Sequence, residues 1–442
     1  MSSEPVTEAL SRCLEALPAE LRIKVAYSGG MDSHVLLHAL RQTLARNGGK
    51  RLSAIHVNHG LHADAGQWAI HCEQVCRDLR VPLEVVEVQV SVEAKEGPEA
   101  AARRARYAAF AQRLERTDAL LLAHHLDDQA ETFLLQLLRG AGPAGLSAMP
   151  AEARLGSGRL LRPLLEVCRN DIRDYAEGHA LAFIEDPGNQ ELRYDRNYLR
   201  HEIMPRIRRR WPAAARTIAR AAGHQAALAR AAREMGTRAL KQAEEGVTLS
   251  CKALSRLHPD AARLALRAWL EARGFSPPSK VILDRILEEV VTAAADAEPL
   301  VVWSGAEVRR YQGALHVTPP LPSAEPDRVV DWDGRRTLVL PQGRLRATPA
   351  KGRGLRAALL GENDMQVRFR RGGERCRPAG HSRSVTLKAW FQRCGVPPWE
   401  RDRVPLIYIR GELAAVAGHW VFEGYQCAES EPGLLLQWTP GA

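Results

Sequence analysis

Residues 22–40, RIKVAYSGGMDSHVLLHAL, decide the fold of the first part of the chain. An apolar run, RIKVAY, leads into a turn of Ser and Gly, and a stretch with helical spacing of apolar residues follows. This order is typical of a strand that opens into a helix. Short apolar runs and amphipathic stretches alternate in the same way as far as residue 138. We therefore expect βαβ units, a parallel sheet and a Rossmann-like α/β domain.

The turn SGGMDS is predicted to bind a phosphate group. Gly29 and Gly30 let backbone amides face an anion, and the hydroxyls of Ser28 and Ser33 stand beside a helix N-terminus, whose dipole favours negative charge. Asp32 adds a carboxylate, which fits a phosphate site when a divalent cation such as Mg²⁺ bridges the two. The chain has no GxxxxGK[ST] motif, so cleavage between the β and γ phosphates is not indicated.

A second motif, HHLDDQAET at residues 124–132, follows the apolar run ALLLA. Side chains at the carboxyl ends of parallel strands meet at one edge of a sheet, so this motif is expected beside the first turn if the two strands are near neighbours. Asp127, Asp128 and Glu131 would then lie in the first turns of a helix, with Asp128 and Glu131 on one face. Taken singly, acidic residues at a helix start are usually caps and dipole partners.

Charge is unevenly distributed along the 442 residues. The chain holds 62 Lys and Arg against 52 Asp and Glu, a net charge of +10. Residues 196–240 contain 11 basic residues and two acidic ones, and residues 351–442 contain 14 basic residues and nine acidic ones. Two separate basic segments favour a nucleic-acid partner over a uniform surface charge that serves only solubility.

Composition shifts divide the chain into three parts. Residues 1–211 form the α/β domain, and residues 212–318 form a small helical domain that opens with a long basic helix. The proline-rich stretch PPLPSAEP, residues 319–326, is a linker. Residues 327–442 contain short alternating runs that predict a mainly β C-terminal domain with one helix at residues 387–393.

Several classes of protein are disfavoured. The eight cysteines include no CxxC pair, so a disulfide framework and a structural zinc site are not indicated. The N-terminal residues lack the pattern of a signal peptide, and no apolar stretch reaches the roughly 18 residues needed to cross a bilayer. We therefore expect a cytoplasmic protein that does not enter a membrane.

The motifs resemble those of one enzyme superfamily. SGGMDS resembles the pyrophosphate loop of the N-type ATP pyrophosphatases, or PP-loop enzymes, and HHLDDQAET resembles the His-x-x-Asp-Asp-x-x-Glu-Thr pattern of their tRNA-modifying branch. The arginine-rich run that begins at residue 368 resembles the C-terminal domain of the tRNA(Ile)-lysidine synthases, and residues 185–205, EDPGNQELRYDRNYLRHEIMP, are similar to the signature of that family. The chain departs from that signature at Gly188, where a Ser or Thr is expected.

The resemblance implies a reaction in which ATP and L-lysine convert the wobble cytidine of a CAU-anticodon tRNA(Ile) to lysidine, through an adenylated cytidine, releasing AMP and pyrophosphate. It implies ATP binding by Ser28, Gly29, Gly30, Met31, Asp32, Ser33 and His124, with Mg²⁺ on Asp32 and Asp128. The catalytic residues would be Asp32, Asp127, Asp128 and Arg200. Contacts to substrate or tRNA would come from Glu131, Arg196, Asn197, Arg371, Arg375 and Lys388.

Two other functions share part of this pattern. A tRNA thiolation enzyme would use the same adenylation step, but it needs reactive cysteines, and Cys72 and Cys76 are the only close pair. A non-catalytic RNA-binding module would use the basic segments alone. The sequence leaves open which carboxylate is the general base, which features of the tRNA are read, and whether the chain forms a homodimer.

Overall fold

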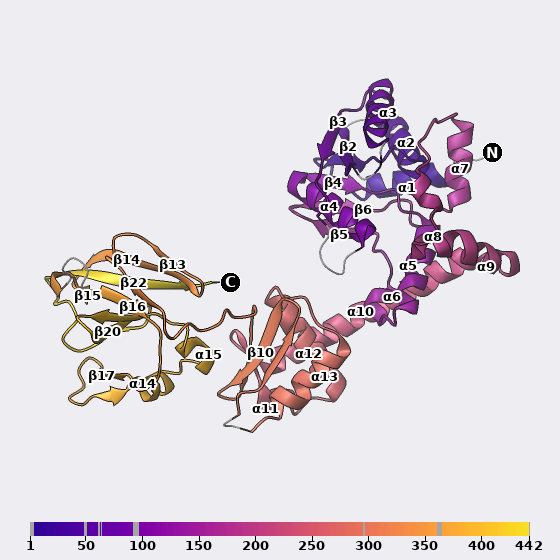
Figure 1. Cartoon of the computed structure of the whole chain (residues 1–442). Helices are drawn as coiled ribbons and strands as arrows, with labels where there is room; N and C mark the ends of the chain where they lie inside the picture. The colour runs from indigo at the N-terminus through magenta and orange to yellow at the C-terminus, as the bar shows by residue number, and fades with distance from the viewer. Residues whose placement is uncertain are drawn as a thin grey trace. The chain divides into compact units, whose positions relative to one another are not determined.

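The computed structural model of the protein describes residues 4–47, 51–60, 62, 64–91, 97–294, 297–359 and 365–441. The chain forms two compact units, Met1–Ala232 and Arg233–Ala442 (Figure 1). The three-part division expected from composition stays a prediction. In the described part of the chain, no helix is long and apolar enough to span a membrane.

The first unit is built on a six-stranded sheet with the order β3-β2-β1-β4-β6-β5. All neighbouring strands are parallel except β5, which pairs antiparallel with β6. The central strand β4 is buried at every position, and β1 alternates buried Ile23 and Val25 with partly buried residues. The expected parallel α/β domain is therefore confirmed. The strands are β1 Arg22–Ala26, β2 Leu52–Asn58, β3 Leu83–Glu87, β4 Asp118–Leu121, β5 Glu152–Leu155 and β6 Gly158–Leu161.

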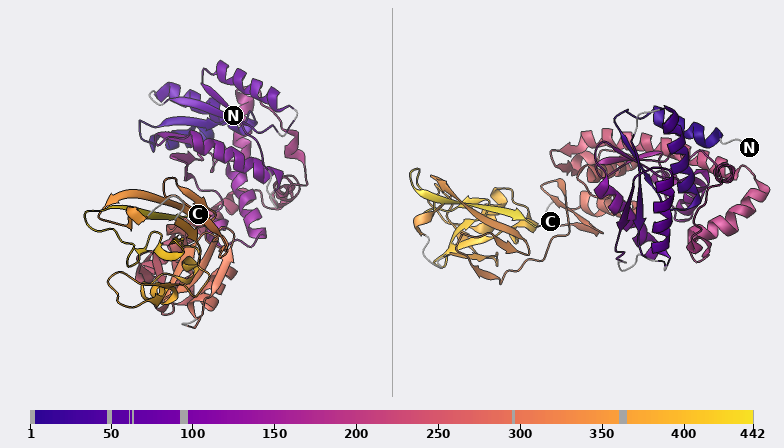
Figure 2. Two further views of the ribbon diagram at one scale, coloured as in Figure 1. Left: turned by 60° about the vertical axis from the view of Figure 1, so that its left-hand side comes forward. Right: turned by 90° about the horizontal axis from the view of Figure 1, so that it is seen from above.

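Helices cover both faces of this sheet and form two cores. One core joins residues of α1, α2, α3 and α7 to the sheet, and the other joins α4 to the opposite face. The helices of the unit, indigo to magenta in Figures 1 and 2, are α1 Glu4–Glu15, α2 Met31–Asn47, α3 Ala65–Asp78, α4 Pro98–Arg113, α5 Leu126–Leu138, α6 Pro143–Leu146, α7 Arg169–Gly178, α8 Asp195–Tyr198 and α9 Met204–Arg210.

Strand order brings the two sequence motifs together. β1 and β4 are adjacent and parallel, with Val25 opposite Leu121. The chain leaves β1 into the SGGMDS turn and leaves β4 into the HHLDDQAET motif, so both motifs lie at the carboxyl edge of the sheet. This placement agrees with the general position of ligand sites in open α/β sheets.

The segment after α7, residues 187–203, returns to the same edge of the sheet and is called the return segment. A short 3₁₀ turn, Pro187–Gln190, is followed by α8 and by a π-helical turn, Leu199–Ile203. Asn197 is buried and donates to the carbonyl oxygens of Gly188 at 2.9 Å and Glu191 at 3.1 Å, which holds this return in place. The basic helix expected from composition is α10, Ala214–Ala243, and it continues from the first unit into the second.

The first part of the second unit is half sheet, although only helices were expected there. Five strands have the order β7-β8-β11-β10-β9, and helices pack on them around the buried Trp269. The sequence signal was weak because two of these strands contain only two and three residues. The elements are β7 Glu244–Glu245, β8 Thr248–Ser250, α11 Cys251–Leu254, α12 Pro259–Ala272, α13 Lys280–Arg285, β9 Leu300–Trp303, β10 Ala306–Tyr311 and β11 Ala314–Thr318.

The C-terminal part is mainly β, as expected. β14 and β22, distant in sequence, pair along nine residues and lie side by side in Figure 1. The predicted helix at residues 387–393 is α14. The strands are β12 Val329–Asp331, β13 Leu338–Leu340, β14 Gly343–Lys351, β15 Leu355–Arg356, β16 Met365–Arg368, β17 Arg375–Cys376, β18 Val385–Thr386, β19 Leu406–Ile409, β20 Glu412–Val416, β21 Trp420–Val421 and β22 Pro432–Pro440; the helices are α14 Leu387–Arg393 and α15 Pro398–Arg401.

Candidate active site

The SGGMDS turn is a tight loop that requires glycine at its second position. Gly29 has φ +86°, a left-handed conformation that glycine adopts at little cost. A Cβ atom at this position would lie 2.7 Å from Ile184 Cδ1 and 3.0 Å from Cys72 Sγ. The backbone N–H of Ile184 also donates to the Gly29 carbonyl at 3.0 Å. The loop is therefore held between α3 and the segment after α7.

The two serine hydroxyls of the turn are linked to each other. Ser28 Oγ and Ser33 Oγ are 3.0 Å apart, and Ser33 Oγ donates to the carbonyl oxygen of Gly30 at 3.0 Å. The backbone N–H of Ser28 donates to Ser33 Oγ at 3.2 Å. Helix α2 begins immediately after Gly30, so its positive N-terminal end faces the same space. Hydroxyls and a helix N-terminus in this arrangement form a cradle for an anion.

Asp32, in the first turn of α2, meets the second motif through His125. Its Oδ2 lies 3.6 Å from His125 Nε2, while Asp128 Oδ2 lies 3.5 Å from the same nitrogen. Burial disfavours a charge on His125, but Asp128, Asp32 and Asp127 outweigh that effect and raise the pKa of His125. Sequence reasoning singled out His124 and missed His125, although a residue just before an acidic helix start is in the capping position.

Asp128 and Glu131 face two arginines from the return segment. Arg200 donates from Nε to Glu131 at 2.7 Å and from an Nη to Asp128 at 2.9 Å. Arg196 makes the matching pair of bonds, at 3.0 Å to Glu131 and 2.9 Å to Asp128. Burial opposes the charge on Asp128, but His125 and the two arginines more than offset it and hold the pKa of Asp128 well below its usual range. We call Asp128, Glu131, Arg196 and Arg200 the charge cluster.

Asp127 turns away from the charge cluster, although it is the neighbour of Asp128. Its carboxylate accepts the backbone N–H of Arg169 at 2.8 Å and pairs with the guanidinium of Arg208. These contacts tie the start of α5 to α7 and α9. In this structure the Asp127 carboxylate links helices.

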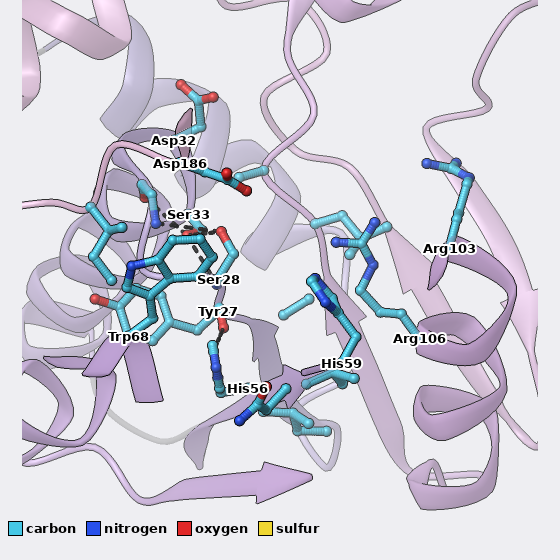
Figure 3. Close-up of a pocket in the computed structure, with 18 of the residues that line it drawn as sticks. Tyr27, Ser28, Asp32, Ser33, His56, His59, Trp68, Arg103, Arg106 and Asp186 are labelled. Atoms are coloured by element: carbon cyan, nitrogen blue, oxygen red, sulfur yellow. Dashed lines mark hydrogen bonds between the residues drawn. The ribbon is translucent and has the colours of Figure 1, made fainter. Parts of the chain in front are cut away.

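A cavity of about 340 Å³ lies against the SGGMDS turn. Figure 3 shows Asp32, Ser28 and Ser33 at one part of this cavity, with Arg103 and Arg106 reaching in from α4. Among the residues expected to bind nucleotide or metal, Ser28, Gly30, Asp32, Ser33, His124 and Asp128 line the cavity.

Sequence reasoning missed several residues that line the same cavity. His56 and His59 stand at the end of β2, and Trp68 lies on α3. The two histidines could have been predicted from the sequence, because β2 is another strand of the parallel sheet and ends at its carboxyl edge. Arg103 and Arg106 carried no such signal. Two arginines three residues apart on a helix have the same sequence pattern whether they line a cavity or face solvent.

Asp32 fits a magnesium ligand better than the charge cluster does. In the described residues, no group of three or more His, Cys, Asp and Glu side chains could hold a metal by itself. Asp32 Oδ1 is nevertheless buried and has no protein hydrogen-bond partner. Mg²⁺ is usually held by one or two carboxylates together with substrate phosphates, so a lone carboxylate oxygen beside an anion cradle matches that ion.

Three residues expected to contact tRNA lie outside this unit. Arg371, Arg375 and Lys388 belong to the C-terminal part, where all three are exposed. The guanidinium of Arg371 is 3.2 Å from Asp327, and Arg375 donates to Ser384. Their assignment to tRNA stays a prediction.

The fold and the phosphate cradle define the first unit as a PP-loop, ATP-binding domain. Residues 3–207 match the family model described as the PP-loop domain. Residues 249–316 match the TilS substrate binding domain, and residues 365–438 match the TilS substrate C-terminal domain.

Curated relatives extend the match over nearly the whole chain. A tRNA(Ile)-lysidine synthase of Coxiella burnetii is 42% identical over 435 residues, which are 98% of this chain and 96% of that protein. One of Alkalilimnicola ehrlichii is 44% identical, over 93% of this chain and 92% of that protein. The chain belongs to the tRNA(Ile)-lysidine synthase family. Among solved structures, the U34-tRNA thiolase NcsA from Methanococcus maripaludis has a TM-score of 0.42 at 17% identity and covers 50% of this chain and 76% of that chain.

Proposed function

We propose that this enzyme joins L-lysine to C2 of the wobble cytidine of CAU-anticodon tRNA(Ile) at the expense of ATP, and releases AMP and pyrophosphate. The observation that carries the proposal is that one cavity holds both the phosphate cradle and Asp128 of the charge cluster. The expected phosphate site therefore lies next to the charge cluster, where the reacting groups would be placed. Family membership supports the same assignment.

The order of steps follows from the chemistry of cytosine. The oxygen on C2 is a poor leaving group, so lysine cannot displace it directly. That oxygen first attacks the α-phosphorus of ATP, and pyrophosphate leaves. The lysine side-chain amine then attacks C2 and loses a proton, and AMP leaves with the former C2 oxygen. Adenylation must therefore precede lysine attachment.

The residues of the turn and of α2 serve the first step. The hydroxyls of Ser28 and Ser33 and the N-terminus of α2 hold the phosphates of ATP. Asp32 would hold Mg²⁺ through the buried Oδ1 that has no protein partner, with Asp128 as the expected second carboxylate. When bound, that ion neutralises phosphate charge and favours pyrophosphate departure.

The charge cluster serves the reacting groups. Negative charge moves onto phosphate oxygens during transfer, and Arg200, which lies only partly exposed, is expected to stabilise it. Its bonds to Glu131 and Asp128 fix the guanidinium beforehand, so little reorganisation is needed. Half-buried, ion-paired groups of this kind are preorganised for electrostatic stabilisation.

Asp127 and Asp128 are the carboxylates considered as proton acceptors for lysine. The amine has an unperturbed pKa near 10.4, so a base is needed at neutral pH. The lowered pKa of Asp128 makes it a weak base, and the Asp127 carboxylate is bound by Arg208 and by the backbone of Arg169. Either assignment requires these contacts to loosen in the complex.

Thiolation fits the structure less well. Cys72 and Cys76, the only close pair of cysteines in the sequence, are both buried in the first core. Burial raises the pKa of each thiol to about 12, with Cys76 adding to the effect at Cys72. Sulfur transfer needs an accessible thiolate, and these two thiols stay protonated at neutral pH.

The proposal is tested by incubating the enzyme with ATP, Mg²⁺, labelled L-lysine and a CAU-anticodon tRNA(Ile) transcript. We expect label in the tRNA and one pyrophosphate per lysine attached. A transcript whose wobble cytidine is replaced by uridine is the matched control and should take up none. Incorporation into that control, or pyrophosphate release without any lysine in the product, would contradict the proposal.

A further inference from the structure

Arg162 and His124 emerge side by side from neighbouring strands. β4 and β6 are parallel, with Leu121 opposite Leu161, and the backbone N–H of Leu122 donates to the carbonyl oxygen of Leu161 at 2.9 Å. Arg162 follows β6 directly, and His124 comes shortly after the end of β4. Both side chains therefore start from the edge of the sheet that carries the ATP cavity.

The hydrogen bond between them has only one direction. Arg162 Nε lies 3.3 Å from His124 Nδ1, and a guanidinium nitrogen can donate but cannot accept. His124 Nδ1 must therefore be the unprotonated nitrogen. Arg162 is 7% exposed, and it also donates from Nη1 to the carbonyl oxygen of Pro150 at 2.7 Å.

The protonation of the second ring nitrogen of His124, Nε2, follows from this bond and from the charge of the ring. Burial lowers the pKa of His124 to about 3. Arg162 and nearby arginines act in the same direction, and the charge of Asp128 opposes them. The ring is therefore neutral at physiological pH. A neutral imidazole carries one proton, and with Nδ1 occupied as acceptor that proton sits on Nε2. The ring lines the cavity, and in the described part of the chain Nε2 has no protein partner.

We propose that Arg162 is a positioning residue for adenylation: it holds His124 in the Nε2–H form, so that the ring donates a hydrogen bond to a phosphate oxygen of ATP. The inference rests on the proposed function, because ATP must occupy the cavity. A donor fixed in advance helps most where charge builds during the transfer.

A purely structural role for Arg162 is less well supported. The segment around Pro150 already has a separate anchor, because Gln129 donates to the carbonyl oxygen of Met149 and accepts its N–H, both at 2.8 Å. The Gln129–Met149 bonds hold this segment without Arg162, so the Arg162–Pro150 bond is not needed to fix it. The bond to His124, by contrast, joins Arg162 to an imidazole that lines the cavity.

The first test reads the tautomer by ¹⁵N NMR of the histidine-labelled full-length enzyme without nucleotide. The His124 signal is identified by its loss in His124→Gln. We expect Nε2 protonated in the wild type, and a mixture that includes the Nδ1–H form in Arg162→Met. Arg162→Lys keeps the charge but lacks Nε, so it should give the same mixture. A wild-type Nδ1–H ring, or a tautomer unchanged in both folded variants, would overturn the inference.

The second test is a double-mutant cycle on tRNA-dependent pyrophosphate release. Arg162→Met should lower kcat about 10- to 100-fold with little change in the KM for ATP, as for loss of a hydrogen bond to a charged group in the transition state. His124→Gln keeps an amide N–H near the Nε2 position and needs no tautomer. Adding Arg162→Met to it should therefore cost less than about threefold.

Arg159→Met is the matched control for these variants. Arg159 lies on β6, the strand that Arg162 follows; it is more exposed and pairs with Glu152 at 2.7 Å, so its loss should leave kcat unchanged. If Arg162→Met lowered kcat equally in the wild-type enzyme and in the His124→Gln variant, Arg162 would act independently of the ring and the inference would be overturned. A wild-type enzyme that releases no pyrophosphate would instead refute the proposed function, and the NMR result separates the two failures.

Discussion

Two arginine-rich regions of this protein use the same residue type in opposite ways. Arg196 and Arg200 in the first unit are 24% and 20% exposed, and each bonds to both Asp128 and Glu131. Arg371 in the C-terminal part is 58% exposed; its guanidinium pairs with Asp327, which is itself 91% exposed, and donates to the carbonyl oxygen of Pro326 at 3.0 Å. The first region holds a fixed charge pattern, and the second presents charge to solvent.

This difference teaches that net charge alone does not assign a function to a basic segment. A half-buried guanidinium with two carboxylate partners has a set position, which suits a reaction site. An exposed guanidinium whose carboxylate partner is also exposed and screened keeps its charge available, which suits a phosphate backbone. The comparison predicts different consequences for substitutions in the two regions.

The largest effect is expected for Asp32, which adjoins the first region. Asp32→Ala should reduce tRNA-dependent pyrophosphate release by about 10³-fold or more, because the buried Oδ1 proposed to bind Mg²⁺ is lost. Binding of tRNA, measured on filters, should change less than about twofold. Asp32→Asn is the isosteric control and should be almost equally inactive. Normal ATP turnover with lost tRNA binding would reverse the assignment of Asp32.

A smaller but still large effect is expected inside the charge cluster. Glu131→Gln removes a negative charge that faces Arg196 and Arg200, and it should lower the free energy of unfolding in urea by about 3 kcal/mol. Lysine incorporation should fall with it. Glu152→Gln breaks an exposed pair with Arg159 and should cost about 0.5 kcal/mol or less. Equal costs for the two variants would contradict the fixed, half-buried positions assigned to Arg196 and Arg200.

In the C-terminal region we expect an effect on tRNA binding without an effect on stability. Replacing Arg371, Arg375 and Lys388 by Ala should weaken binding of intact tRNA and reduce the slope of log affinity against log salt by about 0.9 for each phosphate that is no longer neutralised. Binding of an isolated anticodon stem-loop should change far less. An unchanged salt slope would show that these exposed charges only face solvent.

The smallest effect is expected for the cysteines, which neither region uses. The double variant Cys72→Ala, Cys76→Ala should keep lysine incorporation within about threefold of the wild type, apart from a stability loss of about 1–2 kcal/mol for the core volume removed. Thermal unfolding and product analysis measure the two quantities. A folded variant that had lost all turnover would revive the thiolation alternative.

The position of the site could be predicted from the sequence where the local pattern and the geometry of parallel strands act together. SGGMDS and HHLDDQAET each follow an apolar run, and parallel strands put such segments at one edge, so the approach of Asp32 to Asp128 could be anticipated. His125, which lies within 3.6 Å of both carboxylates, was missed. The short strands β7 and β8 gave no periodic signal, and the five-stranded sheet in the first part of the second unit was missed.

The partners of long side chains could not be predicted in the same way. Arg200 was expected among the catalytic residues, but its partners were not. The structure shows it bound to Glu131 and Asp128, a pairing that depends on where the segment after α7 passes α5. The bond between Arg162 and His124 likewise depends on β6 lying next to β4. Such contacts are set by tertiary packing, which a single sequence does not display.

The central claim, that ATP activates the tRNA before lysine attacks, is tested most directly with ATP labelled at the α-phosphate. The enzyme, Mg²⁺ and CAU-anticodon tRNA(Ile) are incubated without lysine, and the tRNA is isolated and analysed. We predict that label is attached to the tRNA as AMP and that adding L-lysine releases it while lysidine forms. Absence of label from the tRNA, together with full lysidine formation once lysine is supplied, would contradict the account.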